Sequence, residues 1–172
     1  MPNWVINKVT FETEDKELLD KILTTVKGKS EEYGGIDFET IIPMPDDIFR
    51  GPIGDKEQKL YGSKNWYDWS WENWGTKWNA CDCESQAKGS NRLEFQTAWS
   101  APHPVIKRLS EMFPDVAIIH KWADEDMGYN CGIKVYKAGD VKFERDESLM
   151  FACDLWNQDY DECIKQWLDD II

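Results

Sequence analysis

The most constraining feature of this sequence is a run of tryptophans. Residues 65–78 contain five of the ten tryptophans in the chain. Each buried indole removes roughly 150–250 Å² from water and requires an acceptor for its N–H. A segment with this many indoles predicts a rigid, specifically packed part of a folded domain. From the helical spacing we expect Trp66, Trp69, Trp74 and Trp78 to be buried, and Trp71, on the opposite helical face, to be exposed.

Length and charge narrow the class of protein. A chain of 172 residues with 41% hydrophobic content is long enough for one well-filled domain. The formal net charge is −13, which repels a nucleic acid backbone unless a local basic patch offsets it. Lys and Arg are scattered singly, and the densest pair, Lys107-Arg108, lies in an expected helix. The first expectation is therefore no direct nucleic acid partner.

Localisation and cysteine chemistry follow from absences in the sequence. The first residues, Met1-Pro2-Asn3-Trp4, lack a secretion signal, and no window reaches about eighteen apolar residues. We expect a soluble protein of the host cell cytosol with no membrane partner. The five cysteines are odd in number and show no Cys-x-x-Cys spacing, so we expect reduced, mostly buried thiols.

Hydrophobic periodicity predicts the first half of the fold. Alternation over residues 3–11 predicts a strand, and one-face spacing from Leu18 to Val26 predicts a helix that ends at Gly28. Residues 28–63 are rich in Gly, Pro and Asp and predict a long ordered loop. A short helix ending at Gly75 and an extended segment over 76–83 follow.

The second half completes a recognisable pattern. A turn at 88–91 precedes a strand over 92–97, a helix over 100–113 capped by Ser100, and a strand over 116–122. This order predicts an α+β fold, the ferredoxin-like split βαβ sandwich with an antiparallel sheet and two helices on one face. Residues 131–136 and 141–143 predict a further hairpin, 150–153 a short strand, and 156–172 an amphipathic helix. We expect a domain over 1–138 with an insertion at 28–75, and a hairpin and acidic helix over 139–172 packed on it.

Several short strings carry a family resemblance. They are Asn3-Trp4, the string from Glu72 to Trp78 (Glu-Asn-Trp-Gly-Thr-Lys-Trp), the strand-to-helix junction from Phe95 to Pro102, and the string from Met127 to Gly132. Over about residues 1–138 the chain resembles the YubB-type ferredoxin-like family of phages and plasmids, whose role is unassigned. The resemblance implies the fold and a mobile-element origin and implies no catalytic residue.

Catalytic and metal-binding signatures are weak. The two histidines, His103 and His120, adjoin no nucleophile motif, and no Gly-rich phosphate loop is present, so we expect no enzyme activity, no catalytic residue and no cofactor. A zinc site stays open as an alternative only if three strands converge. Its ligands would come from Cys81, Cys83, Cys131, His120 and Asp124.

The end of the chain is strongly acidic. Residues 144–172 hold nine Asp and Glu and only Arg145 and Lys165, a net charge of −7. Clustered carboxylates can imitate the phosphates of DNA toward a basic partner. We therefore expect a non-enzymatic protein-binding factor, such as an anti-CRISPR or other anti-defence inhibitor, that acts as a DNA mimic on a basic host protein that handles nucleic acid. The expected partner-binding residues are Asp159, Asp161, Glu162, Asp169, Asp170, Asp124, Glu125, Asp126 and Trp71.

A second function stays open. Exposed indoles can stack on bases, so the sheet face and Trp71 also fit a nucleic acid or nucleotide-binding module. Tryptophan fluorescence that is quenched by a single-stranded oligonucleotide would favour this alternative over the protein-binding factor.

Overall fold

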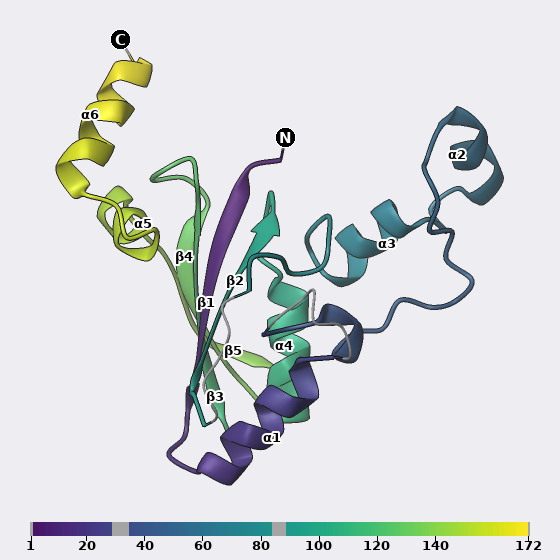
Figure 1. Ribbon diagram of the computed structural model, residues 1–172, viewed down its shortest axis with the longest axis horizontal. Helices are drawn as coiled ribbons and strands as arrows, with labels where there is room; N and C mark the ends of the chain where they lie inside the picture. Colours follow the sequence, from purple (N-terminus) through teal and green to yellow (C-terminus); the bar gives the residue numbers. More distant parts are fainter. Residues whose placement is uncertain (1, 29–34, 84–88, 172) are drawn as a thin grey trace.

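The structure, a computed structural model, describes residues 2–28, 35–83 and 89–171 (Figure 1). One antiparallel sheet of five strands, in the order β2-β1-β3-β4-β5, forms its centre. The strands are β1 (Trp4–Glu12), β2 (Arg92–Ala98), β3 (Ala117–Asp124), β4 (Cys131–Lys137) and β5 (Asp140–Asp146). The helices are α1 (Lys16–Val26), the 3-10 helix η2 (Phe38–Thr40), α2 (Asp55–Tyr61), α3 (Trp66–Asn73), α4 (His103–Met112), α5 (Leu149–Leu155) and α6 (Tyr160–Ile171).

Alternation along the strands separates the two faces of the sheet. In β1, Val5, Val9 and Phe11 are fully buried, whereas Lys8 and Thr10, on the other face, are partly exposed. The buried face is covered by α1 and α4, which lie on the same side of the sheet in Figure 1. The apolar stripe of each helix packs against this face, so the main core lies between the sheet and these two helices.

Local signals place the ends of the two covering helices. The Asp15 carboxylate accepts hydrogen bonds from two backbone N–H groups of the first turn of α1, at 3.0 and 3.1 Å. Pro104 lies in the first turn of α4, where its missing N–H costs nothing. Pro102 rather than Ser100 occupies the N-cap of α4, and the Ser100 hydroxyl donates to the Gly75 carbonyl instead.

The predicted ferredoxin-like class is confirmed. β1, α1, the segment around Cys81, β2, α4 and β3 follow the split βαβ order, and both helices cover one face. The expected strand over 76–83 is wrong, because only one antiparallel bridge forms there, between Cys81 and Gln96. A left-handed backbone at Asp82, with φ of 45°, prevents extension of this ladder.

Three other local predictions need correction. The expected loop over 28–63 contains η2 and α2. The expected strand over 150–153 is helix α5. The expected helix over 156–172 begins only at Tyr160, because Asn157 has a φ of 52° and the Asp159 carboxylate caps the first turn of α6. The turn at 88–91 falls partly outside the described residues, whereas the hairpin at Ala138-Gly139 is confirmed.

Candidate tryptophan-lined binding site

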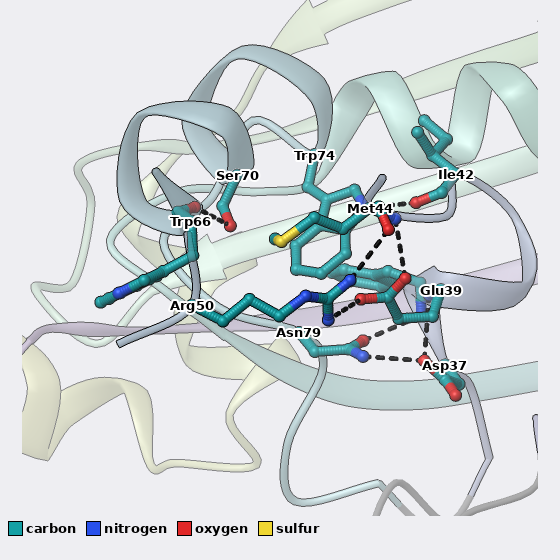
Figure 2. Close-up of polar contacts among 10 residues, drawn as sticks. Asp37, Glu39, Ile42, Met44, Arg50, Trp66, Ser70, Trp74 and Asn79 are labelled. Carbon is teal, nitrogen blue, oxygen red and sulfur yellow. Dashed lines mark hydrogen bonds and ion pairs between the residues drawn. The ribbon is translucent and has the colours of Figure 1, made fainter. Parts of the chain in front are cut away.

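A cavity of about 400 Å³ lies where the tryptophan-rich segment meets the sheet. Its lining comes from β1 (Trp4), from α3 and its C-cap (Trp66, Ser70 and Trp74), from the segment that follows (residues 77–81), from η2 (Glu39), and from the loop between η2 and α2 (Met44 and Arg50). Figure 2 shows the Arg50 side chain reaching from the Trp66 side of this region toward Glu39, which lies on the other side. Three segments distant in sequence thus build one concave surface.

The indoles of the wall are fixed by hydrogen bonds. Trp66 Nε1 donates to the Gly51 carbonyl at 3.1 Å, and Trp74 Nε1 donates to the Ile42 carbonyl at 2.9 Å. Trp74 is 4% exposed and packs edge-on against Phe38. Because their N–H groups are already satisfied, these rings offer a ligand rigid apolar faces.

A polar network holds the loop against the segment that lines the cavity. Asn79 Nδ2 donates to the Asp37 carboxylate at 2.8 Å, and Asn79 Oδ1 accepts from the Phe38 N–H at 2.8 Å (Figure 2). The side chains of Asp37 and Asn79 are thus bonded to each other and to the backbone. This pairing fixes the start of the loop that carries Glu39 and Arg50.

Arg50 provides positive charge at the cavity. Its guanidinium contacts Glu39 Oε1 at 3.3 Å and donates to the Met44 carbonyl at 2.8 Å, and Glu39 Oε2 accepts from the Met44 N–H at 2.7 Å (Figure 2). These bonds use two of the five N–H donors of the guanidinium. The Arg50 side chain is 51% exposed, so its remaining donors are accessible to a ligand.

A row of partly exposed indoles extends from the cavity along the surface. The rings of Trp4 and Trp78 lie 6.2 Å apart, and Lys77 Nζ lies 4.3 Å from the Trp78 ring and 4.4 Å from the Trp99 ring. Trp99 in turn stacks on Trp71 at 6.0 Å with an interplanar angle of 11°. Both cation–π distances are within the range of favourable contact, so the Lys77 ammonium is held between two indoles.

The expectations for the tryptophan run are thus met only in part. Among the four indoles expected to be buried, Trp74 is buried, whereas Trp66, Trp69 and Trp78 are partly exposed. Trp71 is also partly exposed, and its stack on Trp99 joins it to the row. The tryptophan run alone does not predict that Trp4 and Trp99, which lie outside it in the sequence, join this row. Both residues belong to the short strings that carry the family resemblance.

His120 is fully buried and His103 is partly buried, and neither histidine lines the cavity. His120 Nε2 lies 3.0 Å from the Asn7 amide oxygen, and His103 Nδ1 lies 3.3 Å from the Tyr136 hydroxyl. Burial lowers the pKa of His103 to about 4 and lowers that of His120 well below its ordinary value. Both rings are therefore neutral at pH 7.

The cysteines do not gather into a metal site in the described part of the chain. Over residues 2–28, 35–83 and 89–171, no three His, Cys, Asp or Glu side chains are placed to hold a metal ion. The strand register across β1, β3 and β4 separates two of the expected ligands. His120 faces the helices, whereas Cys131 faces α5 on the other side of the sheet. Burial raises the pKa of Cys81, which lines the cavity, to about 11.

The acidic residues at the end of β3 and directly after it make hydrogen bonds within the fold. The buried Asp124 carboxylate accepts from Asn3 at 3.4 Å and Asn130 at 3.2 Å. Asp126 accepts from Asn3 at 2.8 Å, and Glu125 accepts from the Trp4 N–H at 2.9 Å. These contacts tie the start of β1 to the end of β3.

The acidic residues of the tail are placed on α6. Asp159, Asp161 and Glu162 are exposed around its first turn. The side chains of Asp169 and Asp170 lie outside the described residues. Figure 1 places α6 far from α3, on the other side of the sheet. The structure therefore does not bring the acidic residues of α6 and Trp71 together.

A comparison with protein-family models finds a match over residues 73–163, to the ferredoxin-like domain in Api92-like proteins. This chain belongs to that family. The match includes β2 to β5, α4 and α5, and it begins inside α3. The family description gives the fold and names no ligand or reaction.

The Api92-like domain also has a neighbour among solved structures, the crystal structure of protein Api92 from Yersinia pseudotuberculosis. The two share 20% sequence identity at a TM-score of 0.46, and the match covers 65% of this chain and 39% of the Api92 chain. No curated protein matches the sequence. In the described residues, no helix has the length and apolar character needed to cross a membrane.

Proposed function

We propose that this Api92-like domain is a non-enzymatic binding module, and that the tryptophan-lined cavity holds a flat ring ligand with negative charge, of the mononucleotide class. The observation that carries the proposal is the conjunction of four indoles and two cationic side chains, Arg50 and Lys77, around one cavity. Flat indole faces favour stacking with a ring, and exposed guanidinium donors favour a phosphate.

Size and charge restrict the ligand further. A volume of about 400 Å³ falls within the range of small-molecule pockets. A net charge of −13 opposes a long polyanion, whose binding depends on many cationic contacts along its backbone. A mononucleotide requires only the local cations at the cavity. The proposal therefore favours a mononucleotide over a nucleic acid strand.

The direct test is calorimetric titration with a nucleoside monophosphate, the matching uncharged nucleoside and a single-stranded oligonucleotide. Arg50→Ala should weaken monophosphate binding by about tenfold or more, because it removes charge-assisted hydrogen bonds. Arg108→Ala is a matched control, since Arg108 is 52% exposed and pairs with Glu111 on α4, outside the cavity. Equal affinity for the monophosphate in both variants would refute the assignment of Arg50.

A second function rests on the acidic α6. This helix points away from the sheet in Figure 1 and presents Asp159, Asp161 and Glu162 to solvent. We also propose that the protein originates from a phage or plasmid of the YubB-type family and acts in the host cytosol. There, α6 would bind a basic nucleic acid-handling protein and inhibit it by mimicry of DNA.

Sensitivity to salt distinguishes binding through the acidic residues of α6 from other kinds of association. Pull-down of nuclease effectors from host lysate should weaken in 0.5 M salt, where the Debye length is only a few ångströms. It should also weaken when Asp159, Asp161 and Glu162 are reversed to Lys. Binding that survives both changes contradicts mimicry of DNA.

A further inference from the structure

In the described residues, the sheet face opposite α1 and α4 is covered at one end. There α5 packs on Ile6, Ala123 and Cys131, which lie side by side on β1, β3 and β4. Figure 1 shows α5 on the side of the sheet opposite α4, with α6 leading away from it. In the described residues, α6 makes its principal contact with α5 and not with the sheet.

Two rows of side chains on this face stay accessible beyond α5. They follow from the strand register and are here called the open face: Glu94, Lys8, Lys121, Ile133 and Arg145 in the first row, and Arg92, Thr10, Ile119, Val135 and Phe143 in the second. Lys121 is exposed and Phe143 is 46% exposed. The three aliphatic side chains are only partly buried.

The open face is basic although the chain is acidic. Its two rows carry four Lys or Arg side chains and one acid, Glu94, which pairs with Lys8 at 3.1 Å, and the next row of the same face adds the exposed Glu12. Arg145 also pairs with Glu147 beside the face. An apolar centre with cationic side chains is complementary to an acidic amphipathic surface.

The same chain supplies such a surface in α6. The side of α6 that carries Cys163 packs on α5, where Cys163 is 3% exposed. Tyr160 and Leu168 stay 38% and 44% exposed, and Asp161 and Glu162 are exposed in the first turn. α6 therefore presents acidic and apolar side chains that have no cover in the described part of the molecule.

The dimensions of the two surfaces also agree. α6 has 12 residues and is about 18 Å long at 1.5 Å per residue. Four spacings of about 4.8 Å between five strands give a row of about 19 Å across the sheet. One α6 helix can therefore lie across one row of the open face.

A chain cannot place α6 on its own open face while Cys163 keeps its contact with α5. Only residues 156–159 join the two helices. We propose that two copies associate, each with its α6 laid across the open face of the other. This reciprocal arrangement uses the same pair of surfaces twice, as a two-fold symmetric dimer requires.

Sedimentation equilibrium of the full chain over a concentration series tests the dimer. Wild type should show a monomer–dimer equilibrium that weakens in high salt. Lys121→Glu and Asp161→Lys should each weaken the dimer by about tenfold, because each reversal acts at both interfaces. Lys107→Glu, an exposed lysine on α4, should have no effect. A wild-type chain that stays monomeric at every concentration overturns the proposal.

Mixing the two reversed variants identifies the geometry. In a mixed dimer, Glu at position 121 of one copy meets Lys at position 161 of the other, and the second interface is wild type. The mixture should therefore regain the affinity that each variant alone has lost, with folding checked by circular dichroism. If the double variant Lys121→Glu/Asp161→Lys regains affinity and the mixture does not, or if neither does, the exchange of α6 between copies is wrong.

Discussion

Replacement of Trp74 measures how much a buried indole of the cavity wall contributes to stability, by comparison with the more exposed Trp99. Trp74 is 4% exposed, donates to the Ile42 carbonyl at 2.9 Å, and packs edge-on against Phe38 and Trp69 at 5.8 and 5.3 Å between ring centroids. Truncation of a buried Trp or Phe to Ala costs about 3–5 kcal/mol. We expect Trp74→Ala to lie near about 4 kcal/mol, because the lost hydrogen bond adds about 1 kcal/mol to the packing loss.

Two further variants calibrate this value. Trp74→Phe keeps one ring and loses the indole N–H, so we expect about half the cost. Trp99→Ala removes a ring that is 38% exposed, with one stacking partner, Trp71, and one cation–π partner, Lys77. Its cost should stay below about 1.5 kcal/mol, since contacts of these kinds contribute about 0.5–1.5 kcal/mol each and solvent already reaches the ring.

Urea unfolding followed by far-ultraviolet circular dichroism measures these differences in stability. This signal does not depend on tryptophan fluorescence, which each substitution would itself change. A loss of about 4 kcal/mol is a large share of the 5–15 kcal/mol typical of a domain, so the midpoint for Trp74→Ala should fall clearly below that for Trp99→Ala. If the two variants agree within about 1 kcal/mol, the burial and contacts of Trp74 do not set its contribution.

Three other predictions concern stability and binding. The histidine contribution to the free energy of unfolding should be fully present above pH 6.5 and should fall as the pH drops toward 4, by up to about 1.4 kcal/mol per pH unit for each histidine, because the unfolded chain takes up protons that His103 and His120 in the folded chain resist. His103→Gln should flatten the slope of the free energy of unfolding against pH. Gly132→Ala should lower the urea midpoint by an amount equivalent to about 1–3 kcal/mol, since the added Cβ would lie 2.7 Å from the Trp122 ring and 2.8 Å from a backbone oxygen, and an unchanged midpoint would contradict this close approach. Asn79→Ala should reduce the free energy of ligand binding, measured by calorimetry, more than it reduces the free energy of unfolding, because it frees the loop that carries Arg50. A larger loss in the free energy of unfolding would contradict a role of Asn79 in positioning Arg50.

The sheet and its two covering helices could be predicted from sequence because their periodicities are regular. Val5, Val9 and Phe11 alternate with polar residues, and the stripes of α1 and α4 have helical spacing. Short apolar segments gave the wrong answer. Residues 150–153 fit either a strand or a helix, and only their packing on Ala123 and Cys131 makes α5 a helix.

The boundary of α6 failed for a different reason. Helical spacing continues from Trp156 through Tyr160, so periodicity alone predicts one helix. The break depends on the backbone of Asn157 and the cap at Asp159, and the Trp156 indole turns to the carbonyls of residues 123 and 124 instead.

Only the aromatic part of the cavity could be predicted from the sequence. The run from Trp66 to Trp78 indicated an aromatic cluster, but Arg50 and Glu39 are single charges in a loop. Nothing in their spacing reports that Asn79 and Asp37 fasten this loop beside the indoles. Sites that depend on such tertiary pairing have no local sequence signal.

The most direct test of the ligand site observes the indoles one by one. In a ¹H–¹⁵N spectrum, a nucleoside monophosphate should shift the indole N–H signals of Trp66 and Trp78, which line the cavity, in a saturable manner. The signal of Trp156, which bonds carbonyls at the end of β3, should stay in place. Saturable shifts confined to the cavity indoles would support the account. Stationary Trp66 and Trp78 signals at saturating ligand would contradict it.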